Sequence, residues 1–289
     1  MKTSAMLKNA TLVVICAVLA GCASVGSMFS SADTKTVEER PANVLYAEAD
    51  QALSKGDYTK AAETFEEVDR QHPYSEEAKK SMLMAAFAYK KAGKLPEAVA
   101  AARRYITLHP GTKEAALAQN IIATSYYDRI NRPSRDQSET KRAVAELETL
   151  VQRYPDSRYA EDAKRQLKIS RDTLAASEMN VGRYYLKKRN YLAAINRFRT
   201  VVTDYQQTTH VEEALMRLTE AYMALGIVNE AQTAAAVLGH NFPDSPWYKD
   251  AYALLKTGGS EPREDTGSWI SRTWKSAMRS VSGSGSSTQ

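Results

Sequence analysis

The fold of this chain follows from one stretch of its sequence, Gly56-Asp57-Tyr58-(x)2-Ala61-(x)3-Phe65-(x)7-Pro73. The same spacing of glycine, small residue and proline returns 37 residues later, over residues 93–110, and again over residues 226–243. Two further copies are less complete. Residues 189–198 carry Arg189 in place of the glycine, and residues 143–155 lack the glycine because a loop is inserted at 130–138. The sequence therefore contains about five copies of one unit.

Each position of the unit has a mechanical role in a pair of antiparallel helices. The glycine closes the last turn of the first helix, because it adopts a left-handed conformation at little cost. The alanine lets the second helix approach the first closely, and the residue four positions later fills the groove between them. The proline then ends the second helix. Apolar residues recur at helical spacing and no strand-like alternation competes, so we predict an all-α fold.

The unit resembles the tetratricopeptide repeat, whose usual period is about 34 residues. Its second-helix positions match that repeat well, whereas the consensus residues of the first helix are mostly missing, with Gly182 and Tyr185 as the best remnant. The resemblance implies an α-solenoid of about five helical hairpins over residues 42–256. The longer period predicts helices that are nearly one turn longer than usual, and residues 157–188 predict one unusually long helix.

Solenoids of this kind bind extended or helical peptides on a concave face that is lined mainly by the first helices. The repeat resemblance places six residues on that face: Tyr46, Asp50 and Leu53 in the first hairpin, and Leu83, Phe87 and Lys90 in the second. The alternative for the apolar residues is packing between repeats. For Asp50 and Lys90 the alternative is an ordinary solvated surface.

The amino terminus has the layout of an export signal, with a basic start, an apolar run over residues 10–19 and then Leu19-Ala20-Gly21-Cys22. The run is shorter than the roughly 20 apolar residues of a membrane-spanning helix. The last four residues resemble the bacterial lipobox, which implies a cleaved signal peptide over residues 1–21 and a diacylglycerol thioether and N-acyl chain on Cys22. The alternative is an ordinary signal peptide with Cys22 as a bystander. However, the only other cysteine, Cys16, lies in the removed segment, so no disulfide can form in the mature chain.

The flanks of the predicted repeat domain have the composition of low-order segments. Residues 22–41 are rich in serine, threonine and acidic residues and predict a solvated tether, while residues 257–289 carry glycines, Pro262 and a serine-glycine end. Within this tail, residues 269–281 predict a short basic amphipathic helix. Such a helix docks on a partner groove or on an anionic membrane surface, or else serves as a loosely packed cap.

The sequence offers no constellation for catalysis. The serine-nucleophile, zinc-protease and phosphate-loop motifs are absent. His72 and His109 each precede a repeat-closing proline, which indicates a role in the turn rather than in metal binding. The formal net charge of +5 falls to +3 without Lys2 and Lys8, too little to indicate nucleic-acid binding. We expect a protein that binds polypeptides, with no metal, no cofactor besides the lipid on Cys22 and no enzymatic activity.

A finer resemblance begins in the third hairpin, with Asn131-Arg132-Pro133-Ser134-Arg135-Asp136-Gln137 and Tyr154-Pro155-Asp156-Ser157-Arg158-Tyr159. Together with the lipobox, the tether and the order of the hairpins, these residues resemble the BamD/ComL family, the lipoproteins of the outer-membrane β-barrel assembly machine. The resemblance covers nearly all of residues 19–255.

That resemblance implies a lipid-anchored protein on the periplasmic face of the outer membrane. The protein would dock on the periplasmic POTRA-type domains of the barrel-assembly subunit, work beside other assembly lipoproteins and receive unfolded outer-membrane proteins. Arg197 matches a family arginine that pairs with an acidic residue of the assembly subunit. On the sequence alone, a repeat adaptor for peptidoglycan enzymes or cell-division machinery stays open. A hydrolase would need a site that the sequence gives no reason to expect.

Overall fold

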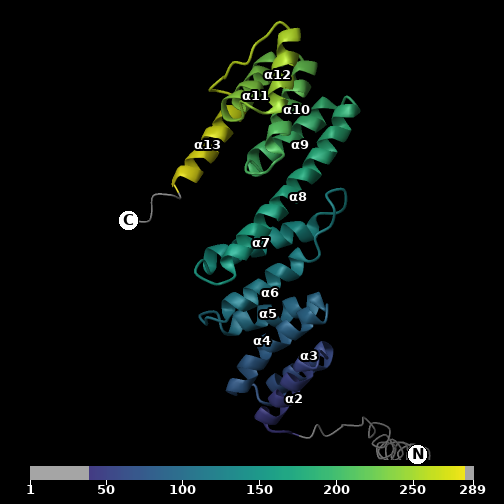
Figure 1. The fold of residues 1–289 in the computed structure, drawn as a ribbon, viewed down its shortest axis with the longest axis vertical. Coiled ribbons are helices and arrows are strands. Elements are labelled where there is room, and N and C mark those ends of the chain that lie inside the picture. Colours follow the sequence, from purple (N-terminus) through teal and green to yellow (C-terminus); the bar gives the residue numbers. More distant parts are fainter. Residues whose placement is uncertain (1–38, 284–289) are drawn as a thin grey trace, which may run out of the picture. The chain divides into compact units, whose positions relative to one another are not determined.

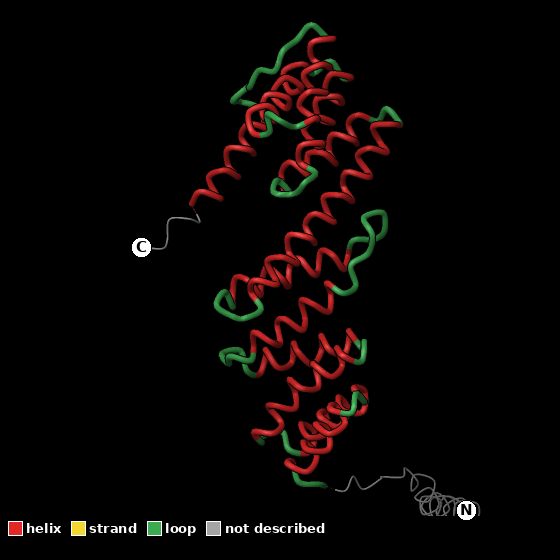
Figure 2. The backbone as a smooth tube through the Cα atoms, viewed as in Figure 1, coloured by secondary structure: helices red, strands yellow, loops and turns green. Residues whose placement is uncertain are grey.

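The computed structural model describes residues 39–283, and every regular element in this part of the chain is an α-helix (Figures 1 and 2). The helices, labelled as in Figure 1, are α2 (Ala42–Ser54), α3 (Tyr58–Gln71), α4 (Glu76–Lys91), α5 (Leu95–Leu108), α6 (Ala115–Tyr127), α7 (Ser138–Arg153), α8 (Ala160–Lys187), α9 (Tyr191–Asp204), α10 (Val211–Ala224), α11 (Val228–Asn241), α12 (Pro246–Thr257) and α13 (Trp269–Gly283). The predicted all-α fold is confirmed. The predicted signal peptide, Cys22 and nearly all of the tether lie outside the described residues.

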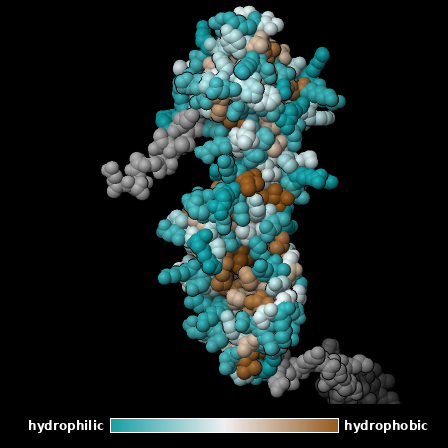
Figure 3. Space-filling view, in the orientation of Figure 1, coloured by the Kyte–Doolittle hydropathy of each residue, from teal (hydrophilic) through white to brown (hydrophobic). Residues whose placement is uncertain are grey.

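The helices α2 to α11 pair into five consecutive hairpins, and each hairpin packs on the next. Each of these helices contacts its neighbour along the chain, and in addition α2 contacts α4, α4 contacts α6 and α6 contacts α8. The first helices of the first four hairpins therefore lie beside one another, as the repeat resemblance implies. On the side drawn in Figure 3, hydrophobic surface gathers around α5 and α6 within a mostly hydrophilic exterior.

The alanine of each repeat unit lies where the two helices of its hairpin cross. Its five copies are fully buried, and so are the five residues that follow four positions later: Ala61, Ala98, Ala143, Ala194 and Ala231, then Phe65, Ala102, Leu147, Phe198 and Ala235. In the fourth hairpin, α8 approaches α9 so closely at Gly182 that an added Cβ would lie 2.4 Å from the ring of Phe198. The repeat register predicted from the sequence is thus confirmed in all five hairpins.

In four of the five hairpins, the turn between the paired helices has the same backbone conformation. Gly56, Gly93 and Gly226 have φ angles of 82°, 75° and 73°. The residue after each glycine donates its N–H to a carbonyl five residues earlier, which closes the helix in a Schellman turn. Arg189 takes the same place after α8 with a φ of 59°, although a side chain makes this conformation costly. The fourth unit therefore keeps the turn geometry although it has lost its glycine, whereas the third unit has an inserted loop at this place.

Helix α8 joins the third hairpin to the fourth. It has 28 residues and contacts both α7 and α9, so that its first half completes the third hairpin and its second half opens the fourth. The prediction of one long helix over this region is confirmed. No helix within residues 39–283 is both long and apolar enough to cross a membrane.

The segment after α12 is more ordered than its composition indicates. The side chain of Gln232 in α11 donates to the carbonyl of Glu261 at 2.8 Å, and the N–H of Asp265 donates to the hydroxyl of Thr233 at 3.1 Å. Ile270 in α13 is fully buried in the core of the last hairpins. The expectation of a low-order tail is therefore wrong for residues 257–283. The loop before α13 has the composition of a flexible segment, but hydrogen bonds to α11 hold it in place. The basic amphipathic helix itself does form, as α13.

We predict that leucine at Ala98 or Ala143 lowers the free energy of unfolding by about 1–3 kcal/mol, because a larger side chain must force the crossing helices apart. Ala145 lies on the same helix as Ala143 but is exposed, so Ala145→Leu is the matched control and should be nearly neutral. Urea denaturation measures all three variants. Equal losses at buried and exposed alanines would contradict the packing role.

We predict that Arg189→Gly raises the free energy of unfolding by about 1 kcal/mol, since glycine adopts a positive φ without the clash of a Cβ. The reverse change, Gly226→Ala, should lower it by a similar amount. No atom lies within 4 Å of the added Cβ at Gly226, so the cost there is conformational alone. Thermal melts of both variants test the pair, and a destabilised Arg189→Gly would contradict the shared turn geometry.

Candidate functional site

The three groove residues predicted in the first hairpin lie on α2 in different environments. Tyr46 packs its ring edge against Phe65 of α3, with ring centroids 5.4 Å apart. Burial, with Asp50 nearby, raises the pKa of the Tyr46 hydroxyl. Leu53 is half-buried against the core of the first hairpins, and Asp50 is exposed. Leu53 thus contacts the core, in keeping with the alternative of packing between repeats, whereas Tyr46 packs within its own hairpin.

The three residues predicted on α4 separate into one core residue and two pocket residues. Leu83 is only 7% exposed and belongs to the core of the first two hairpins, so its placement in an open groove is wrong. Phe87 and Lys90 lie on the accessible side of α4 and line a pocket of about 410 Å³. The structure thus places two of the six predicted residues together in a cavity.

This cavity, which we call the α4–α6 pocket, lies between the second hairpin, the third hairpin and the start of α8. Its lining residues are Phe87, Lys90, Lys91, Leu117, Asn120, Ile121, Thr124, Arg158 and Tyr159. A second cavity of about 310 Å³ adjoins it and shares Leu117, Arg158 and Tyr159. The two together form a groove along α6.

The α4–α6 pocket combines cations with aromatic and aliphatic walls. The ammonium of Lys91 lies 5.6 Å from the centroid of the Phe87 ring, and the guanidinium of Arg158 lies 4.9 Å from that of Tyr159. None of the described lining residues is acidic, whereas Lys90, Lys91 and Arg158 are basic. The pocket is therefore suited to a peptide that presents an apolar side chain beside carbonyl or carboxylate oxygens.

Lys90 is the most constrained of these cations. Its ammonium lies 3.3 Å from a carboxylate oxygen of Asp128 and also donates to the hydroxyl of Thr124. Burial lowers the pKa of the Lys90 ammonium against the opposing influence of Asp128. These contacts direct the ammonium towards α6, where it is one wall of the pocket.

Sequence reasoning missed the pocket residues outside α4. Asn120 and Thr124 lie one 37-residue period after Leu83 and Phe87, so the repeat itself contained the signal that could have found them. Arg158 and Tyr159 come from the loop before α8, which the repeat does not reach. Only the packing of the third hairpin brings them to the pocket.

Arg197 lies on the exposed side of α9, as its position beside the buried Phe198 predicts. Its guanidinium is 3.1 Å from a carboxylate oxygen of Glu178 on α8, and the Arg197 and Glu178 side chains are 45% and 22% exposed. Arg197 is thus presented at the surface but already has a carboxylate partner within the chain. Its part in binding another protein stays a prediction.

Two of the four histidines, His72 and His109, occupy turn positions. His72 and His109 end α3 and α5, and each donates its backbone N–H to the carbonyl four residues before it, which confirms their turn role. Within residues 39–283, no group of three or more histidine, cysteine or acidic residues is arranged to hold a metal ion.

Comparison with known proteins places this architecture in a family. The family model described as "Outer membrane lipoprotein", YfiO, matches residues 38–238. The chain belongs to the YfiO family. The match spans α2 to most of α11, so the α4–α6 pocket and Arg197 lie within the family region and α13 lies beyond it.

Two proteins that are similar in sequence carry the same name. The "Outer membrane protein assembly factor BamD" of Caulobacter vibrioides is 42% identical over 86% of this chain and 81% of its own. The protein of the same name from Rickettsia prowazekii is 40% identical over 85% of this chain and 95% of its own. The resemblance to the BamD/ComL family is confirmed. Among solved structures, the P58(IPK) TPR domain is 14% identical over 84% of this chain and 66% of that chain, with a TM-score of 0.39.

Proposed function

We propose that this protein is an assembly factor for outer-membrane β-barrel proteins, with a non-enzymatic role as a scaffold. The proposal rests on sequence identity to two proteins that are named as outer membrane protein assembly factors. This chain is 42% identical to one and 40% identical to the other, and each alignment covers most of both chains. These names do not favour the alternative of an adaptor for peptidoglycan enzymes. A stack of hairpins suits a scaffold, because each unit adds surface for another polypeptide.

The α4–α6 pocket is the proposed site for segments of unfolded barrel proteins. A strand of a barrel alternates apolar and polar side chains, and in its unfolded form its backbone carbonyls are unpaired. Phe87 and Leu117 offer apolar contacts for alternate side chains, while the cations and the Asn120 amide offer donors to oxygens. Recognition of this kind tolerates many sequences, as a factor that serves different barrels requires.

Arg197 is the proposed contact to the barrel-assembly subunit. The planar guanidinium can bind a carboxylate of a partner with two parallel hydrogen bonds, and it is exposed enough to do so. Glu178 holds the Arg197 side chain at the surface of α9 in the free protein. The partner carboxylate would then share the guanidinium with Glu178 or displace it.

A lipid anchor on Cys22 would hold this scaffold on the periplasmic face of the outer membrane, near the other assembly lipoproteins. Each buried CH₂ of an acyl chain contributes about 0.8 kcal/mol, and two or more chains give stable anchoring. The proposal is supported by Leu19-Ala20-Gly21-Cys22 and by the description of the family as outer membrane lipoproteins.

We predict that Lys90→Met weakens binding of a synthetic barrel-strand peptide about fivefold, because the pocket loses a charged donor. Lys94→Met is the matched control. Lys94 also faces a carboxylate, 3.6 Å away on Glu63, but it does not line the pocket, so its loss should leave binding unchanged. Fluorescence anisotropy with the labelled peptide measures both. Equal affinities for the two variants would exclude the α4–α6 pocket as the peptide site.

We predict that Arg197→Glu weakens co-purification of the barrel-assembly subunit by tenfold or more, about 1.4 kcal/mol, with little change in melting temperature. Glu178→Gln breaks the same internal ion pair but keeps the cation, and should therefore preserve co-purification. If both variants lose the subunit equally, the internal ion pair rather than a contact of Arg197 is responsible.

We predict that Cys22→Ala abolishes lipid anchoring, because no other cysteine of the mature chain can accept the diacylglyceryl group. Cell fractionation should recover the variant as unprocessed precursor or as soluble periplasmic protein. Tight fractionation with the outer membrane, equal to that of the native chain, would show that Cys22 is not the anchor.

A further inference from the structure

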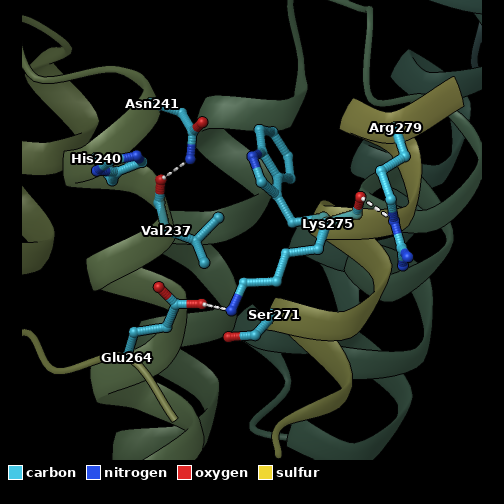
Figure 4. Close-up of a pocket in the computed structure, with 8 residues that line it drawn as sticks. Val237, His240, Asn241, Glu264, Ser271, Lys275 and Arg279 are labelled. Carbon is cyan, nitrogen blue, oxygen red and sulfur yellow. Dashed lines mark hydrogen bonds and ion pairs between the residues drawn. The ribbon is translucent and has the colours of Figure 1, made fainter. Parts of the chain in front are cut away.

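A separate cavity lies between α11 and α13, and we call it the α11–α13 pocket (Figure 4). It has a volume of about 590 Å³ and is lined by Val237, His240, Asn241, Glu264, Ser271, Trp274, Lys275 and Arg279. All of these residues except Val237 lie beyond residue 238, where the family match ends. The cavity is thus built largely by a part of the chain that the family region does not include.

Helix α13 forms one wall of this cavity. The side chain of Trp274 is only 8% exposed, and its ring makes a T-shaped contact with the ring of Phe242, with ring centroids 5.9 Å apart. At the start of the helix, the indole N–H of Trp269 donates to the hydroxyl of Tyr222 at 3.0 Å, and the guanidinium of Arg199 lies 4.8 Å from the Trp269 ring. These contacts fasten α13 to the fourth and fifth hairpins, so the wall exists before any ligand binds.

The charges along α13 have one sign. Arg272, Lys275 and Arg279 are basic, and residues 269–283 contain no aspartate or glutamate. The one acidic lining residue of the pocket, Glu264, comes from the preceding loop rather than from either helix. The wall itself therefore attracts anionic groups.

Glu264 shows which anionic group fits. Its carboxylate lies 3.1 Å from the ammonium of Lys275, and Figure 4 shows the Lys275 side chain extending towards it. This contact lowers the pKa of the Glu264 carboxyl, so the group is ionised at neutral pH. Glu264 is itself exposed, which leaves its carboxylate free to move aside. A carboxylate on an extended polypeptide segment already occupies the position that a ligand carboxylate would take.

The floor of the cavity offers apolar contact. Val237 and Trp274 are buried apolar side chains at the lining. The cavity is suited to a side chain with an apolar body that is followed by a carboxylate.

We propose that the α11–α13 pocket binds an acidic segment of a partner protein, in which a carboxylate replaces Glu264 on Lys275 and a neighbouring apolar side chain packs between Val237 and Trp274. Glu264 is an internal competitor in this arrangement. It keeps the cation paired in the free protein and lowers the affinity for the partner segment, since the pocket is open only in the fraction of molecules where Glu264 has left. A polypeptide is favoured over a lipid surface because the present occupant is itself a side chain of an extended segment.

The test uses the full mature chain and two fluorescein-labelled decapeptides. One alternates glutamate with leucine and phenylalanine, and the other has glutamine at every glutamate. In fluorescence anisotropy we expect the glutamate peptide to bind and the glutamine peptide to bind at least tenfold more weakly. Lys275→Gln should weaken the glutamate peptide about fivefold, whereas Glu264→Gln should strengthen it about threefold, because the competitor has lost its charge.

Lys249→Gln is the matched control, because Lys249 is an exposed lysine of α12 that does not line the pocket. Equal effects of Lys249→Gln and Lys275→Gln would overturn the proposal, as would equal binding of the two peptides. Weaker binding of the glutamate peptide by Glu264→Gln would overturn the proposal too, and that result does not depend on the stability of the Lys275 variant.

A second experiment tests a lipid ligand by measuring binding of the protein to phosphatidylglycerol vesicles. Lys275-dependent binding to vesicles without binding to the glutamate peptide would assign the pocket to a lipid headgroup instead.

Discussion

The close crossing of two helices at a buried small residue is the constraint on which the rest of this structure depends. A side chain no larger than alanine at each crossing, with no exposed surface in any of the five hairpins, fixes how near the second helix lies to the first. That distance sets the thickness of each hairpin, and hence the spacing at which the next one packs. The left-handed turn between the helices serves the same geometry, and Arg189 adopts it at a conformational cost.

Function follows from this stacking because it brings together side chains that are far apart in the sequence. The α4–α6 pocket takes its residues from α4, from α6 and from the loop before α8, with cations beside aromatic rings. The α11–α13 pocket forms in a different way. Helix α13 lies outside the repeats and packs against them through Trp269 and Trp274. One pocket belongs to the region shared with the family and the other to the extension beyond it.

The sequence predicted the hairpins well because their signals are local. The spacing from glycine to alanine to proline is set by helix geometry, so the register and the long α8 could be predicted without knowledge of distant contacts. Leu83 was assigned to the groove and is buried, because the repeat pattern does not say how far the next hairpin covers a first helix. Residues 257–268 have the composition of a flexible loop, and their order comes from tertiary bonds to Gln232 and Thr233. Arg158 and Tyr159 reach the pocket through tertiary packing alone.

The central claim is that the face formed by the first helices receives unfolded barrel proteins. The most direct measurement is site-specific photo-cross-linking in cells, with benzoyl-phenylalanine at Asn120 in the α4–α6 pocket and, as the reference, at Thr107 on the exposed side of the second helix α5. The account predicts cross-links from residue 120 to newly exported outer-membrane β-barrel proteins, and few or none from residue 107. Equal cross-linking at both positions, or cross-links to barrel proteins from residue 107 alone, would contradict it.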